Sequence, residues 1–583
     1  MELDNLLLQV NKPARYIGQE WNVSNKNFND AAVRFALCFP DLYEVGMSNL
    51  GIRIIYDILN AQPDVLCERF FSVSDDLEDK LREGGKNILS LESQKPLKEF
   101  DLIGFSLESE LDYTNVLRIL DLGGIPLNAA ERGSNYPLVI GGGTCALNPE
   151  PMHQFFDLFL VGEAEELIVE FIDNYRKYKP SLAEGRLSKE KLLFLLSQVE
   201  GVYVPSFYET SVSCEGKMLE FRPKIEGIAR RIKKRIVRDL EKARFPARWL
   251  VPYIQIIHDR VTLEIMRGCP NRCRFCQARN QYYPFRLRSQ EELLRLAESA
   301  YINSGYEELS LLGLSVSDYP GIEKLLEALN SLFRNKAVSI SLPSVKPKAH
   351  VGRLSSEIAK VKKTGLTFAP EAGSVRMREI LGKDFDEDDF FRSLEEAYAA
   401  GYQHVKLYFM IGIPGESEED LDKIIDFSVR VSELKRKVKG SPAQVNISIN
   451  ALIPKPHTAF QWFPMPAPEV IRQKQDYLKA KCRNRRLKLT FHSIQMSFLE
   501  AVLSRGDRRL SSVIFEAFKN GAKFDAWGDH FSLDKWNEAF RKNGIDGLDY
   551  LKARSPQDIL PWDFIDIGMD REELLREYNK ILQ

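Results

Sequence analysis

The chain is 583 residues long, which exceeds the size of one ordinary domain and predicts three or four domains. Its 44% hydrophobic and 28% charged residues are typical of a globular protein, and no apolar run is long enough to span a bilayer. The net charge of −2 excludes neither RNA nor protein partners, because a nearly neutral total can contain local patches. The N-terminal sequence has acidic residues and no continuous apolar stretch, so we expect no signal peptide and a cytoplasmic protein.

The N-terminal part of the chain alternates apolar strands with amphipathic helices. After an extension over residues 1–30, this pattern predicts a doubly wound parallel sheet in a domain spanning residues 31–180. Ligands of such sheets bind at the carboxyl ends of the strands. The predicted strands cover residues 33–39, 101–107, 137–143 and 155–162.

A second α/β domain is predicted over residues 251–467, after a β-hairpin and a basic connector within residues 181–250. Six strand–helix units form a partial (β/α)6 barrel rather than a closed eight-fold barrel. Residues 468–583 are predicted to form a mostly helical accessory region. The barrel strands are predicted at residues 261–266, 308–314, 338–345, 365–370, 404–414 and 445–452.

Cys269, Cys273 and Cys276 form a C-x3-C-x2-C motif directly after the first predicted barrel strand. Three thiolates on one loop can hold three corners of a 4Fe-4S cluster. One iron then keeps an open position, which usually indicates chemistry rather than a structural metal site. A structural zinc site is the alternative, but it would need a fourth Cys or His at close spacing.

The stretch RGCPNRCRFCQAR resembles the radical S-adenosylmethionine superfamily, and the resemblance extends over the whole second α/β domain. It implies that S-adenosylmethionine chelates the open iron through its amino and carboxylate groups. One electron from the cluster would then cleave the sulfonium and give a 5′-deoxyadenosyl radical. The resemblance also implies an electron donor of the flavodoxin or ferredoxin type.

The same resemblance implies a set of S-adenosylmethionine-binding residues. An aromatic residue and an isoleucine are expected at the adenine, and a glycine-rich strand end at the amino group. A carboxylate is expected at the ribose, and an arginine at the carboxylate, which a guanidinium can grip through two hydrogen bonds. The glycine-rich segment resembles the L-L-G form of the methylthiotransferases. In this order the residues are Phe275 and Ile413, Gly313 and Ser315, Glu371, and Arg376 with Arg378 as its alternative.

The N-terminal domain resembles the cobalamin-binding module that precedes many radical S-adenosylmethionine cores. Its first strand is followed by D-x-Y-x-x-G, where modules that ligate cobalt often have D-x-H-x-x-G. Because tyrosine is a poor cobalt ligand, either the lower face of a bound cobalamin is unligated or cobalamin is absent. The implied residues are Asp41, Tyr43 and Gly46, the glycine turn Gly141, Gly142 and Gly143, and the G-E-x-E element Gly162, Glu163 and Glu165.

Other residues give competing hypotheses. Cys38, Cys67 and Cys145 all lie in the N-terminal domain, and methylthiotransferases carry three N-terminal cysteines for a second cluster, although free cysteines are often simply buried. Two basic segments can neutralise phosphates, although charge runs are often solvated faces. These segments comprise Arg230, Arg231, Lys233, Lys234, Arg235 and Arg238, and later Lys479, Lys481, Arg483, Arg485, Arg486 and Lys488.

The whole layout resembles an uncharacterised bacterial family that fuses a cobalamin-like module to a radical S-adenosylmethionine core. Our first hypothesis is methyl or methylthio transfer to RNA or to a ribosome-associated protein. The alternatives are an enzyme acting on a small molecule or peptide, and a non-catalytic protein that senses the cluster or S-adenosylmethionine. The pattern identifies no catalytic acid or base, because the radical itself abstracts hydrogen and protein groups mainly position the substrate.

Overall fold

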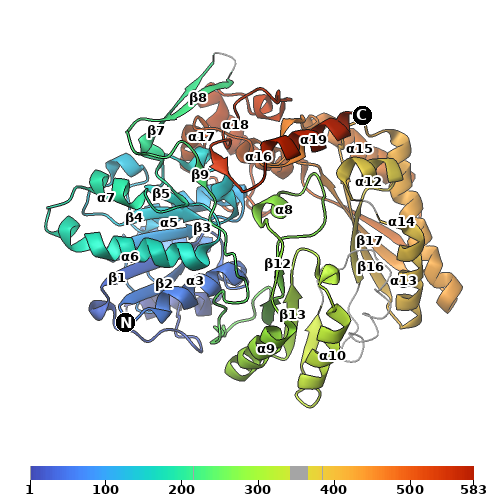
Figure 1. Ribbon diagram of the computed structural model, residues 1–583, viewed down its shortest axis with the longest axis horizontal. Coiled ribbons are helices and arrows are strands. Elements are labelled where there is room, and N and C mark those ends of the chain that lie inside the picture. The colour runs from blue at the N-terminus through green and yellow to red at the C-terminus, as the bar shows by residue number, and fades with distance from the viewer. Residues whose placement is uncertain (1, 214–215, 342–365, 384) are drawn as a thin grey trace.

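The computed structural model describes residues 2–213, 216–341, 366–383 and 385–583 (Figure 1). The N-terminal domain contains a six-stranded sheet in the order β2-β1-β3-β4-β5-β6. The first five strands are parallel, and β6 pairs antiparallel with β5, which confirms the doubly wound fold. The strands are β1 (Val33–Phe39), β2 (Val65–Phe71), β3 (Leu102–Ser106), β4 (Leu138–Gly142), β5 (Leu158–Leu160) and β6 (Val202–Tyr203).

Strand β2 was not among the predicted strands because two charges stand in its centre, Glu68 and Arg69. Both side chains are buried, and both are partnered. Glu68 accepts a hydrogen bond from Ser93 Oγ at 2.8 Å, and Arg69 pairs with Glu20 at 2.6 Å. Partners distant in sequence therefore make a buried strand out of a segment that does not look apolar.

Helices cover both faces of this sheet, as a doubly wound topology requires. Helices α3 (Leu50–Ala61) and α6 (Ala164–Ala183) pack together on one face. Helices α4 (Asp75–Glu83) and α5 (Tyr113–Leu122) pack together on the other face. The apolar side chains between these layers form the largest core of the molecule.

The second α/β domain contains two parallel sheets that together follow the partial-barrel pattern (Figure 1). Every predicted barrel strand contains a strand in the structure, although residues 342–345 of the third prediction lie outside the described residues. The first sheet comprises β10 (Val261–Glu264), β13 (Glu308–Leu312) and β14 (Ser339–Ser341). The second comprises β15 (Leu366–Glu371), β16 (His404–Ile411), β17 (Gln444–Ala451) and β18 (Leu487–Phe491).

Strand β18 comes from the region in which we expected helices. It pairs in parallel with β17, so the core sheet continues beyond residue 467. The sequence signal is weak because this five-residue strand follows a run of basic residues. The outer layer of the barrel consists of α9 (Gln290–Ser304), α10 (Ile322–Leu332), α13 (Glu387–Ala399), α14 (Glu418–Lys439) and α15 (Pro468–Lys481).

The remaining C-terminal helices join the two domains rather than forming a separate unit (Figure 1). Helices α16 (Ile494–Ser504), α17 (Leu510–Lys519) and α18 (Leu533–Lys542) contribute to the core of the N-terminal domain. Helix α19 (Arg571–Leu582) packs instead on the barrel beside α12 (Val375–Leu381). None of the helices in the described ranges combines the length and apolar character needed to cross a bilayer.

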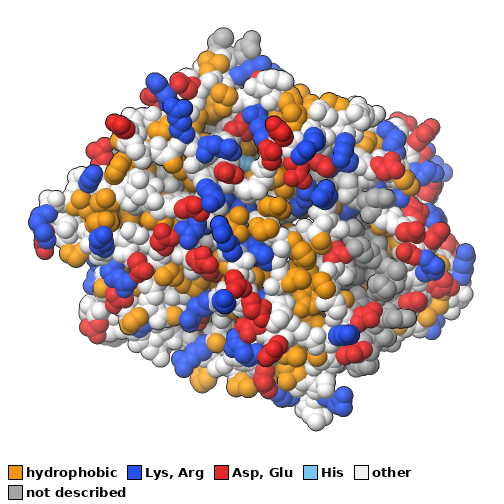
Figure 2. Space-filling model, viewed as in Figure 1, with side chains coloured by type: hydrophobic (Ala, Val, Ile, Leu, Met, Phe, Trp, Pro, Cys, Tyr) orange, Lys and Arg blue, Asp and Glu red, His pale blue; other side chains and the backbone are white. Residues whose placement is uncertain are grey.

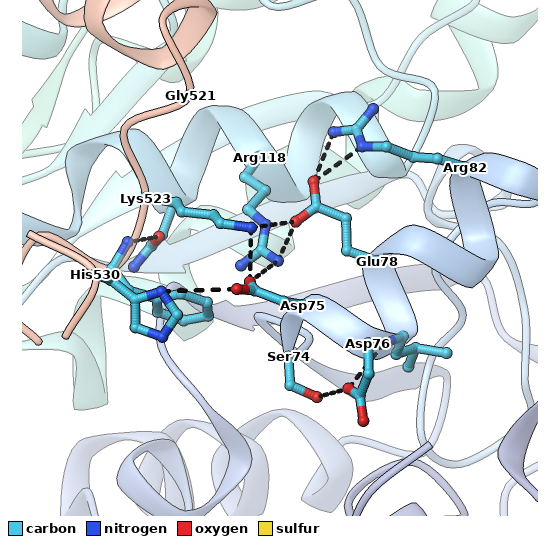
Figure 3. A network of polar contacts seen from close by, with 12 residues as sticks. Ser74, Asp75, Asp76, Glu78, Arg82, Arg118, Gly521, Lys523 and His530 are labelled. Carbon is cyan, nitrogen blue, oxygen red and sulfur yellow. Dashed lines mark hydrogen bonds and ion pairs between the residues drawn. The ribbon is translucent and has the colours of Figure 1, made fainter. Parts of the chain in front are cut away.

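A polar network fixes the C-terminal region on the N-terminal domain (Figure 3). Lys523 Nζ lies 2.6 Å from Asp75 Oδ1, and His530 Nδ1 lies 3.7 Å from Asp75 Oδ2. The Arg118 guanidinium pairs with Glu78 and lies over the ring of Phe524, 4.7 Å from its centroid. Because α4 and α5 both begin at the carboxyl edge of the sheet, this network covers part of that edge.

Two smaller pairings complete the connection between the domains. The predicted hairpin is present as β7 (Tyr208–Val212) and β8 (Met218–Pro223). In the basic connector, β9 (Ile232–Lys233) pairs in parallel with β19 (Ile565–Asp566) from the C-terminal region.

Candidate functional site

A cavity of about 520 Å³ lies between the carboxyl ends of the N-terminal sheet and those of the first barrel sheet. The N-terminal domain lines it with residues that follow β1, β3, β4 and β5, and the barrel with the ends of β10 and β13. Because the neighbours of β1 on its two sides are β2 and β3, this edge includes the switch point of the sheet, where such folds bind ligands. The cavity is therefore the candidate active site.

The cysteine loop begins and ends at this cavity. Met266, Arg267 and Gly268 line the cavity just before Cys269, and Gln281 and Tyr282 line it again at the end of the short helix α8 (Gln277–Gln281). Gly268 has φ of 80°, and a Cβ there would lie 2.7 Å from the Tyr282 carbonyl oxygen. Only glycine fits this close approach between the two ends of the loop.

The three cysteine thiols are grouped and partly exposed. Burial, together with the neighbouring Cys276 and Cys269, raises the pKa of Cys273 to about 11, whereas Lys383 opposes this shift. Binding of iron would therefore release protons from these thiols. No three His, Cys, Asp or Glu side chains within the described ranges converge on one metal ion. A cubane cluster does not require this, because each thiolate binds a different iron, so the three thiols fit a 4Fe-4S cluster.

Gly313 and Ser315 lie next to the cysteine loop. A Cβ at Gly313 would lie 2.5 Å from the Met266 side chain, so glycine is needed for this approach. Ser315 Oγ donates to Asp318 Oδ2 at 2.7 Å. The same carboxylate oxygen accepts from Asn271 Nδ2 at 2.6 Å, and Asn271 also lies 3.4 Å from Cys269 Sγ. A short polar chain thus connects Ser315 to the first cysteine.

Glu371 ends β15 in a left-handed conformation with φ of 68° and pairs with Lys383 at 3.4 Å. Burial raises the pKa of Glu371, and both charges influence the pKa of Cys273. Our sequence analysis did not identify Lys383. The available signal was the preceding Gly382, where a Cβ would lie 2.7 Å from the Arg272 carbonyl oxygen. This glycine lets the end of α12 approach the cysteine loop and places Lys383 beside it.

The two residues predicted at the adenine come together in one apolar cluster. Ile413 is 3% exposed, and Phe275 packs against the cluster that contains it. The segments that carry them are far apart in sequence, so this proximity arises from the barrel topology. The other members of the cluster include Ala372, Met377, Leu452, Phe460 and Phe463.

The structure does not support the predicted role of Arg376. Its side chain is 54% exposed, pairs with Asp420 and donates to the Gly415 carbonyl at 3.0 Å. The alternative Arg378 is buried and pairs with Glu387. Both guanidinium groups are therefore engaged in holding α12 and its neighbours in place. Lys383 is the cation that the fold places beside the cysteines.

The D-x-Y-x-x-G loop is closed by contacts within the chain. Tyr43 Oη donates to Glu20 Oε1 at 2.8 Å, and burial raises the pKa of Tyr43. Asp41 Oδ1 accepts from Trp527 Nε1 at 3.0 Å. A Cβ at Gly46 would lie 2.2 Å from the ring of Phe71. Packing thus explains all three residues, and Tyr43 is not available as a cobalt ligand.

Replacing Tyr43 with phenylalanine is expected to lower the free energy of unfolding by about 1.5–3 kcal/mol, because a buried hydrogen bond to a charged group is lost. Guanidinium chloride unfolding measures this change. Tyr253→Phe is the matched control, since Tyr253 also donates one hydrogen bond, to the Gln19 carbonyl, but is 61% exposed. It should change stability by less than about 0.5 kcal/mol. Equal effects of the two variants would contradict this interpretation of Tyr43.

The glycine turn has mixed roles. A Cβ at Gly141 would lie 2.4 Å from the ring of Phe159, so packing requires this glycine. Around Gly142, the nearest atoms to such a Cβ are 3.8 Å away. Gly143 has φ of 90° and lines the cavity together with Thr144. Only the last glycine of the turn therefore borders the candidate site.

The G-E-x-E element binds the barrel. Arg267 lies 2.5 Å from Glu165, 2.9 Å from Glu264 and 3.4 Å from Glu163. Glu163 also pairs with Arg286 at 2.6 Å. This set of five side chains, which we call the interdomain clamp, fixes the strand end that precedes Cys269. The sequence analysis identified the G-E-x-E element but not its partners Arg267 and Arg286, because they lie in the second α/β domain.

The other cysteines are placed in the hydrophobic core. Cys38 lies on β1 and Cys67 on β2, and neither is exposed. Cys145 follows β4 and is 7% exposed. Burial raises the pKa of all three thiols. This environment is that of structural cysteines and does not support a second cluster.

The basic segments do not form a basic surface at the cavity. Lys234 is buried and donates to the Gln281 carbonyl at 2.7 Å, and Arg235 pairs with Glu170 at 2.6 Å. The second segment lies at the end of α15 and the start of β18, at the amino ends of the core strands. Figure 2 shows basic and acidic side chains interspersed over the face drawn there.

Comparison with known families gives two matches. Residues 51–205 match the family described as "Radical SAM proteins, N-terminal", and residues 263–428 match the radical SAM superfamily. An uncharacterized protein of Methanocaldococcus jannaschii is 29% identical over 513 residues, which cover 88% of this chain and 97% of that protein.

Two named relatives match a smaller part. The tRNA-2-methylthio-N(6)-dimethylallyladenosine synthase of Syntrophomonas wolfei is 29% identical over 178 residues, and the ribosomal protein uS12 methylthiotransferase RimO of Pelotomaculum thermopropionicum is 27% identical over 175 residues. These matches cover 29% and 28% of this chain. The chain spans only 40% and 39% of the length of these two relatives.

Among solved structures, the chain is similar to the cobalamin-dependent S-adenosylmethionine radical enzyme OxsB with aqua-cobalamin and S-adenosylmethionine bound. The TM-score is 0.47 at 12% identity, with 94% of this chain and 79% of OxsB covered. The radical S-adenosylmethionine methyltransferase TsrM of Kitasatospora setae gives a TM-score of 0.43 at 12% identity, with 72% and 73% covered.

Proposed function

We propose that this chain, a radical S-adenosylmethionine enzyme with an N-terminal α/β domain, transfers a methyl or methylthio group to an unreactive carbon. The observation that carries this proposal is the position of the cysteine loop, which begins and ends on a cavity shared by both domains. An acceptor held there lies next to the site of radical formation. The names of the relatives that match the core support group transfer of this kind.

In this proposal, three groups of residues have different roles. Cys269, Cys273 and Cys276 hold the 4Fe-4S cluster, which, when bound, supplies the electron that cleaves S-adenosylmethionine to methionine and a 5′-deoxyadenosyl radical. The apolar side chains around Phe275 and Ile413 pack against the adenine and exclude water. Polar groups beside the loop orient the rest of the molecule, namely Ser315, Glu371 and Lys383.

The acceptor in our first proposal is RNA or a ribosome-associated protein. The support is that the two named relatives modify a tRNA and ribosomal protein uS12, according to their names. A second candidate, a small molecule or peptide, is favoured by the limited volume of the cavity. It is also favoured because Lys234 already donates to the Gln281 carbonyl and Arg235 already pairs with Glu170. Binding of RNA that weakens steeply with salt would favour the first candidate.

Cobalamin is a proposed additional cofactor. The cavity takes up part of the carboxyl edge of the doubly wound sheet, and a cobalamin module would present its ligand at this edge, beside the acceptor. A cobalamin bound there would receive no cobalt ligand from Tyr43, whose hydroxyl is bonded to Glu20. One-to-one binding of hydroxocobalamin with a shifted absorption spectrum supports this part of the proposal, and absence of binding contradicts it.

The proposed reaction is tested with the anaerobically reconstituted full-length protein, S-adenosylmethionine and dithionite. We expect 5′-deoxyadenosine and methionine in equal amounts, and about four irons per chain. With methyl-labelled S-adenosylmethionine, label should enter RNA or protein from a ribosome-containing extract, or else its small-molecule fraction. A reduced cluster that binds S-adenosylmethionine but yields no 5′-deoxyadenosine would identify a sensor and refute the proposal.

A further inference from the structure

The charges that line the cavity are nearly all compensated within the protein. Within the described ranges, four carboxylates line it, and three of them belong to the interdomain clamp, namely Glu163, Glu165 and Glu264. Arg267 and Arg286 bind these three, and Lys234 supplies a third positive charge close to Glu163. Three carboxylates thus stand against three cations. None of these groups therefore has an uncompensated charge that could bind a ligand.

The fourth carboxylate, Glu108, is different. Its Oε1 accepts from Ser106 Oγ at 2.9 Å, and no ion pair with a basic side chain occurs within the part of the chain that the structure describes. Burial raises the pKa of Glu108, opposed only by hydrogen bonds from Ser106 and Thr144. No neighbouring positive charge contributes to this balance. Glu108 is therefore the uncompensated charge of the cavity.

The surroundings of Glu108 define what it can bind. Tyr282, which follows the cysteine loop, also lines the cavity, and Glu108 is the first of the charged groups that raise its pKa. The two side chains thus come from different domains and influence each other. The rest of the wall is largely apolar and includes Leu50, Ile54, Ile55, Met266, Leu312 and Leu314.

We infer that the cavity binds the acceptor through a cationic or N–H-bearing group, such as an amine, a guanidinium or the edge of a nitrogen heterocycle, which Glu108 holds. The inference rests on the proposed function and names the chemical class of its acceptor. A donor at Glu108 satisfies a partly buried carboxylate whose desolvation is otherwise unfavourable. A phosphate or carboxylate in the same place would repel it. The apolar walls then pack the body of the acceptor near the cysteine loop.

The test uses butylguanidinium as the cationic probe and pentanoate as its anionic counterpart, with the reconstituted full-length protein. We expect butylguanidinium to bind to the wild type and to raise its midpoint of thermal unfolding, whereas pentanoate does neither. Glu108→Gln should weaken butylguanidinium binding about 10-fold or more. Glu190→Gln, which removes an exposed carboxylate outside the cavity, is the matched control and should leave binding unchanged.

A second measurement shows that Glu108→Gln is folded and that the carboxylate is uncompensated. A carboxylate whose pKa is raised by folding destabilises the folded protein once the pH exceeds its unfolded-state pKa. The variant should therefore be more stable than the wild type at pH 8, and this difference should disappear as the pH falls below the unfolded-state pKa. A variant that is less stable at pH 8 would show that Glu108 is compensated and would overturn the inference.

Other outcomes separate this inference from the proposed function. Equal binding of butylguanidinium by Glu108→Gln and wild type overturns the inference, as does binding of pentanoate with similar affinity. Displacement of butylguanidinium by hydroxocobalamin would assign the cavity to the corrin ring and overturn it as well. Formation of 5′-deoxyadenosine by a wild type that does not bind butylguanidinium would refute the inference and leave the proposed function intact. Binding without 5′-deoxyadenosine would do the reverse.

Discussion

Cys276→Ala is expected to abolish 5′-deoxyadenosine formation and to leave the reconstituted protein without its characteristic 4Fe-4S absorption. Removal of a thiolate ligand should cost more than the ~10–100-fold loss that follows from changes to groups around a metal site. The fold should survive, because Cys276 is only partly buried and lies outside the apolar cores of both domains. Anaerobic iron determination, the electron paramagnetic resonance signal of the reduced protein and product analysis measure these effects.

Cys482→Ala is the matched control for this variant. Cys482 is also partly exposed, but it lies at the end of α15 on the outer layer of the barrel. This variant should retain about four irons per chain and full 5′-deoxyadenosine formation. A Cys276→Ala protein that keeps its cluster and its activity would refute the assignment of the three cysteines. About eight irons per wild-type chain would instead revive the second cluster.

Arg267→Ala is expected to lower the free energy of unfolding by about 3–5 kcal/mol, because it leaves buried carboxylates without their cation. Arg267 is 8% exposed and binds three carboxylates from both domains. Guanidinium chloride unfolding followed by circular dichroism measures this loss. Neutralising one partner in the double variant with Glu165→Gln should restore part of the stability, since the cost arises from unpaired charge rather than from lost packing.

Arg295→Ala provides the comparison. Arg295 also pairs with a carboxylate, that of Glu292, but its side chain is 63% exposed. We expect a change of less than about 0.5 kcal/mol. An Arg267→Ala protein within about 1 kcal/mol of the wild type would show that the interdomain clamp contributes little to holding the domains together.

The features that the sequence predicted best are those recorded by local patterns. Alternating apolar strands and helices indicated both α/β domains, and the spacing of Cys269, Cys273 and Cys276 indicated the cluster loop. Strand β2 was missed because Glu68 and Arg69 interrupt its apolar pattern and find partners far away in sequence. Strand β18 was missed because its five residues follow a basic run. A local pattern does not record such distant partners.

The site residues follow the same rule. Gly313 and Ser315 lie beside the cysteine loop because strand order places them there, and this order followed from the resemblance. The pairing of Arg376 was not foreseen because the position of its partner Asp420 depends on how α12 and α14 pack. Lys383 and Glu108 were not identified for a related reason. A single charged residue after a turn is common in any sequence, and only the fold shows that Lys383 lies beside the cysteines and that Glu108 has no basic partner among the described residues of the cavity.

The packing of α16, α17 and α18 against the N-terminal domain has a consequence for biosynthesis. The first sheet leaves the ribosome early, but its core also contains side chains between residues 496 and 567. The N-terminal domain therefore completes its core only after nearly the whole chain has been synthesised, although domains commonly fold one after another during translation. Until then the cysteine loop faces an incomplete partner.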